Sequence, residues 1–251
     1  DHYSISHDAT GVTCLLENIT ISAHDSGHNA VDAESKTVNL STSSGKGDWI
    51  GVVSGATGLS NGAAGDGAAS FTFSAGATSA VLTFAHPVLS GNSETFGFNV
   101  TDGSITEQSG SATTALDDPG ITYSLAGFRF IDSSGATLIP TQISGKASNI
   151  APNADTFYLQ AVRASDSNPN VCVAALSGAK TIQLAAQCDN PSSCVSGQTF
   201  NVKSGSNPAV DVALNSAAPA TPTSFSNVSM TFDGEAKAPL ILNYSDAGLM
   251  Q

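Results

Sequence analysis

The stretch SFTFSAGATSAVLTF, from Ser70 to Phe84, decides the fold because a near copy returns as SMTFDGEAKAPLILNY, from Ser229 to Tyr244. In both copies large apolar residues alternate with small or polar residues on either side of a turn. In the first copy these apolar residues are Phe71, Phe73, Leu82 and Phe84. Alternation with a period of two places such side chains on one face of a β-strand. Each copy is therefore predicted to be a β-hairpin.

The repeat extends upstream of the hairpins. A Lys-Thr-aliphatic-x-Leu segment begins at Lys36 and again at Lys180, and each follows a strand-like segment and a polar loop. The order of three elements is thus preserved in two halves, which indicates tandem copies of one domain. We predict an all-β protein of two tandem immunoglobulin-like antiparallel β-sandwich domains.

Domain boundaries follow from composition. The polar, turn-rich segment that ends in Asp117-Asp118-Pro119-Gly120 is typical of a linker. We predict a first domain at residues 1–110, a linker at 111–120 and a second domain at 121–251. The first hairpin is followed by a closing strand, TFGFNV from Thr95 to Val100, and the second has no counterpart of it. The second domain is therefore expected to lack its last strand, either because a processing boundary removes it or because another subunit supplies it by β-augmentation.

Charge and composition exclude several functions. The net charge is −13, from 8 Lys plus Arg against 21 Asp plus Glu, whereas nucleic-acid and anionic-membrane binders carry basic surfaces. No apolar run approaches the roughly 20 residues of a membrane span. The acidic loops either keep a secreted surface soluble or hold calcium, and the paired carboxylates of Asp117 and Asp118 are the candidate calcium ligands. No other cofactor is expected.

The four cysteines indicate an oxidising compartment. Cys188 and Cys194 bracket five polar residues, and we predict a disulfide between them because so short a turn is easily closed. Cys14 and Cys172 are then left in different predicted domains, either free and buried or bridging the two copies. A zinc site is the rival interpretation, but no second ligand pair has zinc-finger spacing.

Few residues indicate chemistry. His24, Asp25 and His28 have the spacing H-D-x-x-H, which would pair two imidazoles on a helix, but this segment is predicted to be a loop in which the histidines are solvated. Trp49, the sole tryptophan, is either a sugar-stacking platform or a packing anchor, and we favour the anchor. The glycine-rich segment from Ser60 to Gly67 lacks the Lys-Ser/Thr of a phosphate-binding loop. We expect no enzymatic activity.

Several short sequence segments, in order along nearly the whole chain, resemble a known family. HYSISHDATGVTC, FRFIDSSGATLIP, FYLQAVRASDSNPNVC, AAQCDNPSSC and FDGEAKAPLILNYSDAG resemble the C-terminal region of the MshQ-like proteins of the MSHA (mannose-sensitive haemagglutinin) type IV pilus system of aquatic Gram-negative bacteria. The resemblance implies a role in pilus biogenesis or as a tip adhesin. Relatives often carry further cysteines in the loop from Ala23 to Ala30, where this chain has histidines, which leaves the pairing of Cys14 open.

These observations predict a non-enzymatic structural or adhesive module of a pilus-associated protein, at the extracellular surface of a Gram-negative bacterium. Its expected partners are other pilus or cell-surface proteins and host or surface glycans, without nucleic acid and without membrane insertion. A carbohydrate-binding module of a secreted protein is the second hypothesis, and it requires an exposed aromatic row. Accessory domains of a surface hydrolase are the third.

Overall fold

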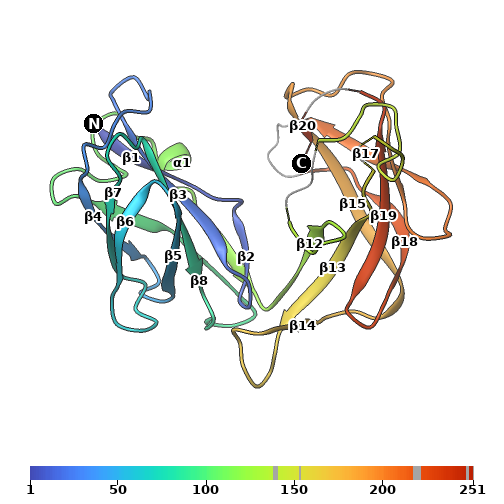
Figure 1. The fold of residues 1–251 in the computed structure, drawn as a ribbon, viewed down its shortest axis with the longest axis horizontal. Coiled ribbons are helices and arrows are strands. Elements are labelled where there is room, and N and C mark those ends of the chain that lie inside the picture. Colours follow the sequence, from blue (N-terminus) through green and yellow to red (C-terminus); the bar gives the residue numbers. More distant parts are fainter. Residues whose placement is uncertain (138–140, 153, 217–221, 247–248, 251) are drawn as a thin grey trace. The chain divides into compact units, whose positions relative to one another are not determined.

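The computed structural model describes residues 1–251 except 138–140, 153, 217–221, 247–248 and 251 (Figure 1). Among the described residues the elements are twenty β-strands and one four-residue helix, so the all-β prediction is confirmed. The chain divides into two compact units. No helix in this described part has the length and apolar composition needed to cross a bilayer.

The units do not follow the predicted boundary. The first unit comprises Asp1–Gly127 and Arg163–Val173, and the second comprises Phe128–Val162 and Ala174–Gln251. The predicted linker at 111–120 therefore lies inside the first unit. Ile121 and Tyr123, which the sequence assigned to the second domain, are fully buried in the first core. They alternate on a strand that pairs with two strands of the first unit, which is why the boundary falls later.

The first unit contains two four-stranded sheets, in the orders β1-β3-β8-β5 and β10-β4-β7-β6, and a small sheet β2-β11-β9. All pairings in the two larger sheets are antiparallel, and the pairing of β2 with β11 is parallel. The elements are β1 (His2–Ser6), β2 (Thr10–Val12), β3 (Glu17–His24), β4 (Thr37–Thr42), β5 (Asp48–Ser54), β6 (Ala56–Asn61), β7 (Ala69–Phe73), β8 (Ser79–Ala85), β9 (Ser93–Phe96), β10 (Phe98–Thr101), α1 (Thr114–Asp117) and β11 (Ile121–Ser124).

The predicted hairpins are wrong in their pairing, although their strands exist. β7 pairs with β4 and β6, whereas β8 pairs with β3 and β5, so the two arms lie in opposite sheets. Both arms bury alternate residues, and the turn between them crosses from one sheet to the other. The period-2 pattern identifies the buried face of each strand but not the strand beside it. Two strands of a hairpin and two strands in opposite sheets of a sandwich have the same pattern.

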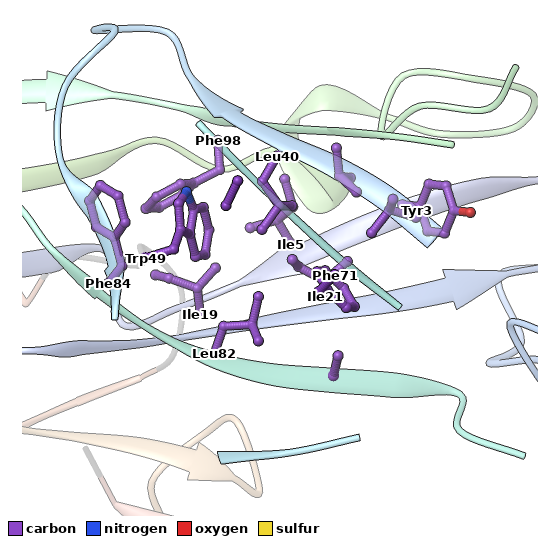
Figure 2. Close-up of a cluster of buried hydrophobic side chains, with 14 of the residues drawn as sticks. Tyr3, Ile5, Ile19, Ile21, Leu40, Trp49, Phe71, Leu82, Phe84 and Phe98 are labelled. Atoms are coloured by element: carbon purple, nitrogen blue, oxygen red, sulfur yellow. The ribbon is translucent and has the colours of Figure 1, made fainter. Parts of the chain in front are cut away.

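The first core fills the space between its two larger sheets. Figure 2 shows Trp49 together with Phe84 and Phe98, whose ring centroids lie 5.0 and 5.5 Å from the indole. Trp49 is buried, and its Nε1 donates a hydrogen bond to the carbonyl oxygen of Gly67 at 3.1 Å. Trp49 is therefore the packing anchor that the sequence favoured.

The second unit repeats part of this order, but its strands form one nine-stranded sheet, because β17 pairs with both β16 and β15. Its strands β12-β13-β19-β16 lie in the same succession as β1-β3-β8-β5, and β15 pairs with β18 as β4 pairs with β7. β18 and β19, the second predicted hairpin, again pair with different strands. The remaining elements of the chain are β12 (Ala126–Ile131), β13 (Phe157–Ala164), β14 (Cys172–Ala174), β15 (Gly178–Asn190), β16 (Phe200–Lys203), β17 (Val210–Ser216), β18 (Ser226–Phe232), β19 (Lys237–Tyr244) and β20 (Leu249–Met250), and Cys172 and Val173 of β14 belong to the first unit.

The second core is separate from the first. It is built from alternating residues of the repeated strands, which are Phe157, Leu159, Val228, Met230, Phe232, Ala238 and Leu240, with contributions from β15, β16 and β17. Each unit therefore has its own hydrophobic core, as expected for two independently packed domains.

Both pairs of cysteines form disulfides. Cys188 bonds Cys194, the pair that the sequence favoured. Cys14 bonds Cys172 across 158 positions, and both lie in the first unit because Arg163–Val173 belongs to it. Two disulfides are typical of proteins that fold in an oxidising, extracellular environment.

We expect the Leu82→Ala substitution to lower the free energy of unfolding of the first unit by about 3 kcal/mol, because Leu82 is completely buried and its loss leaves a cavity. Val53→Ala, at an exposed position in the same sheet, is the matched control and should cost less than about 0.5 kcal/mol. Urea unfolding followed by the fluorescence of Trp49, the sole tryptophan, reports on the first unit alone. Equal losses in both variants would contradict this description of the core.

Candidate metal centre

Two histidines and one aspartate from distant parts of the chain meet in the first unit. They are His2 on β1, His28 in the loop after β3, and Asp117 at the end of α1. His2 Nε2 lies 3.2 Å from Asp117 Oδ1, and His28 Nδ1 lies 3.9 Å from the same oxygen. The three potential ligand atoms all lie within 4.8 Å of one another. This is the separation expected of groups that can share one ion after a small adjustment.

Strand pairing and a fastened loop bring the histidines together. The antiparallel register of β1 and β3 places His2 opposite His24, at the end of β3 from which the loop begins. The Asp25 carboxylate accepts hydrogen bonds from the backbone N–H groups of Gly27 and Asn29, at 2.8 and 2.9 Å, and so closes the loop. His28 has a positive φ of 59°, a conformation available in such a turn. The loop thereby carries the His28 ring to the His2 ring, with centroids 4.7 Å apart.

His24, the other histidine of the H-D-x-x-H motif, supports this arrangement from outside the ligand group. Its ring stacks on His2 at 5.3 Å, its Nε2 lies 2.8 Å from Ser4 Oγ, and its Nδ1 lies 3.1 Å from the carbonyl oxygen of His28. Both ring nitrogens are therefore engaged. The expectation of a solvated histidine is therefore wrong for His24, whereas His28 is exposed, as expected, and its ring also contacts His2.

His2 and Asp117 each keep one atom available at the centre. The His2 side chain is completely buried, and its Nδ1 lies 3.4 Å from Asp1 Oδ2, while its Nε2 has no hydrogen-bond partner. Asp117 Oδ2 accepts a hydrogen bond from the Thr113 N–H at 2.6 Å, which leaves Oδ1 directed at the histidines. A buried nitrogen that makes no hydrogen bond, although a carboxylate oxygen lies 3.2 Å away, is uncommon and calls for an explanation.

Asp118, the second predicted calcium ligand, is not part of this cluster. The group of three potential ligands identified among the described residues contains Asp117 but not Asp118. Burial raises the pKa of the Asp118 carboxyl, and the nearby Glu107 raises it further. Calcium binding by this pair stays a prediction. His2 escaped the sequence analysis because it lies 115 positions from Asp117, and only the pairing of β1 with β3 relates it to His28.

One pentapeptide has the spacing of a hydrolase nucleophile elbow. Gly58-Leu59-Ser60-Asn61-Gly62 reads G-x-S-x-G, a pattern that requires a strand, a sharp turn and then a helix. Here Ser60 lies exposed within β6, and the next element of the chain is the strand β7. The context of a nucleophile is therefore missing at this serine.

A second carboxyl of the first unit has an altered acidity. Glu17, the first residue of β3, is largely buried, and this burial, together with the charge of Asp8, raises its pKa to about 8. Tyr123 lies near both carboxyls, and burial followed by these charges raises its pKa as well. Its hydroxyl is buried without a hydrogen-bond partner. Glu17 is thus protonated at neutral pH, whereas an exposed glutamate is ionised.

Comparison with protein-family models gives one match. Residues 108–251, more than half of the chain, match the family described as "Domain of unknown function (DUF6701), first Ig-like domain". The match covers the second sandwich together with α1 and β11 of the first unit. No curated protein matches the chain.

Solved structures show only remote similarity. The structure described as "Complete structure of manganese lipoxygenase of Gaeumannomyces graminis and partial structure of zonadhesin of Komagataella pastoris" is 11% identical, with 98% of this chain and 84% of that chain covered and a TM-score of 0.28. A Salmonella alpha-2-macroglobulin mutant is 8% identical, with 97% of this chain and 16% of that chain covered and a TM-score of 0.26. Scores this low carry no argument about function.

We expect the first unit to lose stability as the pH rises from about 4.5 to about 8. The folded state holds the Glu17 proton up to the raised pKa, whereas the unfolded chain releases it near 4.5, so the unfolded state gains across this window. Glu17→Gln, which keeps the shape without the titration, should remove this part of the slope. Urea unfolding of both proteins by Trp49 fluorescence at several pH values checks it, and identical slopes would show that Glu17 is ionised in the folded state.

Proposed function

This chain belongs to the DUF6701 family, and from that membership we propose that it is a non-enzymatic structural or adhesive module of a pilus-associated cell-surface protein. The Ig-like description of the family and the two disulfides are compatible with an extracellular module of this kind. The MshQ-like phrases quoted above support the finer assignment to the MSHA pilus of a Gram-negative bacterium. The function of a sandwich fold is otherwise open, because the same architecture hosts many activities.

The use of aspartates in loops is the observation that carries this proposal. Five loop aspartates, distributed over both units, each accept two hydrogen bonds at their carboxylates from nearby backbone N–H groups, at 2.8 to 2.9 Å. The residues are Asp25, Asp66, Asp102, Asp132 and Asp233. Such bonds fix turns locally without a ligand. A module whose loops are fixed in advance presents a constant surface to a partner at low entropic cost.

The acidity of these carboxyls agrees with that role. The backbone hydrogen bond from Asn29 is the main cause of the lowered pKa of Asp25, and the hydroxyl of Ser134 is the main cause for Asp132. The pKa of Asp102 lies far below its usual range, although burial opposes the shift, because the N–H groups of Ile105 and Ser104 stabilise the carboxylate. These loops therefore stay fastened across the pH range of natural waters.

Glycan binding is a second candidate, favoured by one pair of aromatic side chains. Phe128 and Phe130 alternate on β12, so they point to the same face, and both are exposed. Exposed rings on one face of a sheet can stack on sugars. The single Trp is unavailable because it is buried in the first core.

The purified chain with intact disulfides, labelled with a fluorophore, tests the proposal on bacteria that carry MSHA-type pili and on an isogenic strain without them. We expect binding that depends on the pili and is lost when the chain is reduced and unfolded. A Phe128→Ala, Phe130→Ala double variant on a glycan array separates sugar recognition from protein recognition. Equal labelling of both strains, or turnover of a glycan or ester by the chain, would contradict the proposal.

A further inference from the structure

We propose that His2, His28 and Asp117 bind one divalent transition-metal ion of the zinc class. The inference concerns the first unit alone and does not depend on the pilus assignment. It rests on three ligand atoms that converge and on a completely buried His2 whose Nε2 has no hydrogen-bond partner.

The geometry needs one small movement. An ion about 2.0 to 2.2 Å from each ligand atom holds those atoms roughly 3.3 Å apart at tetrahedral angles. His2 Nε2 and Asp117 Oδ1, at 3.2 Å, already have this separation. His28 Nδ1, at 3.9 Å from Asp117 Oδ1, has to approach, and its ring lies 42% exposed on a surface loop. Two ligands are therefore fixed in the protein and the third is adjustable.

The surroundings of the ligands suit a metal. Asp1 Oδ2 lies 3.4 Å from His2 Nδ1 and can accept its proton, and in that tautomer the Nε2 lone pair is left for an ion. Asp1 is held in turn by the N–H and hydroxyl of Ser111, at 2.8 and 2.7 Å. The Thr113 N–H occupies the other oxygen of Asp117. Carboxylates that orient metal-binding imidazoles in this way are a regular feature of metal sites.

The donor set selects the class of ion. Two imidazole nitrogens and one carboxylate oxygen suit zinc and neighbouring transition ions, whereas calcium prefers six to eight oxygen ligands. Three protein ligands leave at least one position for water or for an external ligand. A bound ion would join β1, the loop after β3 and α1 through His2, His28 and Asp117.

Titration of tag-free, EDTA-treated chain with Zn²⁺ by calorimetry, and with Co²⁺ by visible absorption, tests the site. We expect one ion per chain and a ligand-field spectrum of four- or five-coordinate cobalt. His28→Ala, at an exposed side chain that leaves the core intact, should weaken Zn²⁺ binding at least about tenfold and abolish the cobalt spectrum. His7→Ala, which removes a histidine outside the cluster, is the matched control and should bind like the parent.

Binding that is absent from the parent, or equal in His28→Ala and the parent, would overturn the proposal. The 3.2 and 3.9 Å contacts of Asp117 Oδ1 with the two imidazoles would then be direct side-chain contacts without a metal. A parallel titration with Ca²⁺ distinguishes the calcium prediction for Asp117 and Asp118. A rise in thermal stability with Ca²⁺ and none with Zn²⁺ would likewise count against a transition-metal site.

A second inference comes from an open strand edge in the other unit. In the first unit β4 lies between β7 and β10. β15 corresponds to β4 with an offset of 144 positions, as Lys180 corresponds to Lys36. β18 takes the place of β7, but no strand among the described residues pairs with Ile182–Ala186 on the other edge, where β10 would lie.

The pairing of neighbouring strands identifies that edge. Cys188 pairs with Ser216 of β17 and with Met250 of β20, so β17 and β20 lie on opposite edges of β15. β17 shares its edge with β18, because the Ala213 N–H donates to Ser226 Oγ where the two strands meet. β20 therefore begins along the edge that is open further down β15.

The core shows the effect of the open edge. Val38 and Leu40 of β4 are buried, and the neighbouring strand β10 adds its own buried side chains Phe98 and Val100 beside them. Their counterparts Ile182 and Leu184 are only partly buried. The same alternating strand is thus less covered in the second unit.

The register of β20 matches the vacant place. Met250 lies opposite Cys188, and the register shifts between Cys188 and Asn190, which lies opposite Leu249. A regular antiparallel continuation beyond Met250 would place its second residue opposite Ala186. In the first unit Phe98 lies opposite Thr42, whose counterpart is Ala186, since 42 + 144 = 186. We infer that this edge takes one antiparallel strand that continues the line of β20 and carries large apolar residues at alternate positions, as β10 does.

Adding Phe-Asn-Val-Thr, the sequence of β10, directly after Gln251 tests this inference. We expect the melting temperature of the second unit to rise by about 5 °C or more, because the added Phe and Val cover Ile182 and Leu184. The control extension Ser-Asn-Ser-Thr forms the same backbone without apolar side chains and should give little change. Calorimetry follows the second unit, while the Trp49 transition of the first unit should not move.

Equal melting temperatures for the two extensions would overturn the inference. So would an equal rise produced by a separate peptide of residues 95–103 at equimolar concentration, since the edge would then recruit a strand from another chain rather than from the line of β20.

Discussion

The structure depends on two sheets that close on one layer of alternating side chains. β7 and β8 carry the same period-2 pattern, yet they enter different sheets, and the chain between them crosses the core. Each arm can bury its apolar face only against the other sheet, because a single sheet would leave that face in water. The aromatic group around Trp49 fills the layer so formed (Figure 2).

Acidic side chains are used at the ends of the strands rather than in the core. With a net charge of −13, a surface of free carboxylates would repel itself, but loop aspartates such as Asp66 and Asp233 are engaged by backbone N–H groups. Asp117 differs from these loop aspartates, because one of its oxygens faces two imidazoles. An aspartate that fixes a loop is therefore surrounded by backbone N–H groups, whereas the candidate metal ligand faces imidazole nitrogens. Amino-acid composition does not show this difference.

The sequence predicted the fold class and the duplication because both are written in local patterns. It could not predict which strands pair with one another. The alternation of Phe71 and Phe73 gives a buried face and leaves the neighbouring strand open, and Ile121 alternates with Tyr123 equally well in either domain. The sequence indicated His28 and Asp117 of the candidate metal cluster separately, as part of a motif and as a possible calcium ligand. It did not indicate that they meet, because strand pairing brings in His2 and a helical turn places Asp117. Cys172 was assigned to the wrong domain because the chain returns to the first unit at Arg163–Val173.

Because the two units share repeated strands, the burial of side chains in the first unit can be compared with that of their counterparts in the second. The succession β1-β3-β8-β5 recurs as β12-β13-β19-β16, and β15 pairs with β18 as β4 pairs with β7, so burial can be compared at matching positions of these strands. Val38 and Leu40 are buried whereas Ile182 and Leu184 are only partly buried, and no strand among the described residues pairs with Ile182–Ala186 as β10 pairs with β4. An edge strand with apolar residues is a known liability in β-proteins. The covered copy thus specifies, in length, direction and side-chain pattern, what the second copy requires of any strand that completes it.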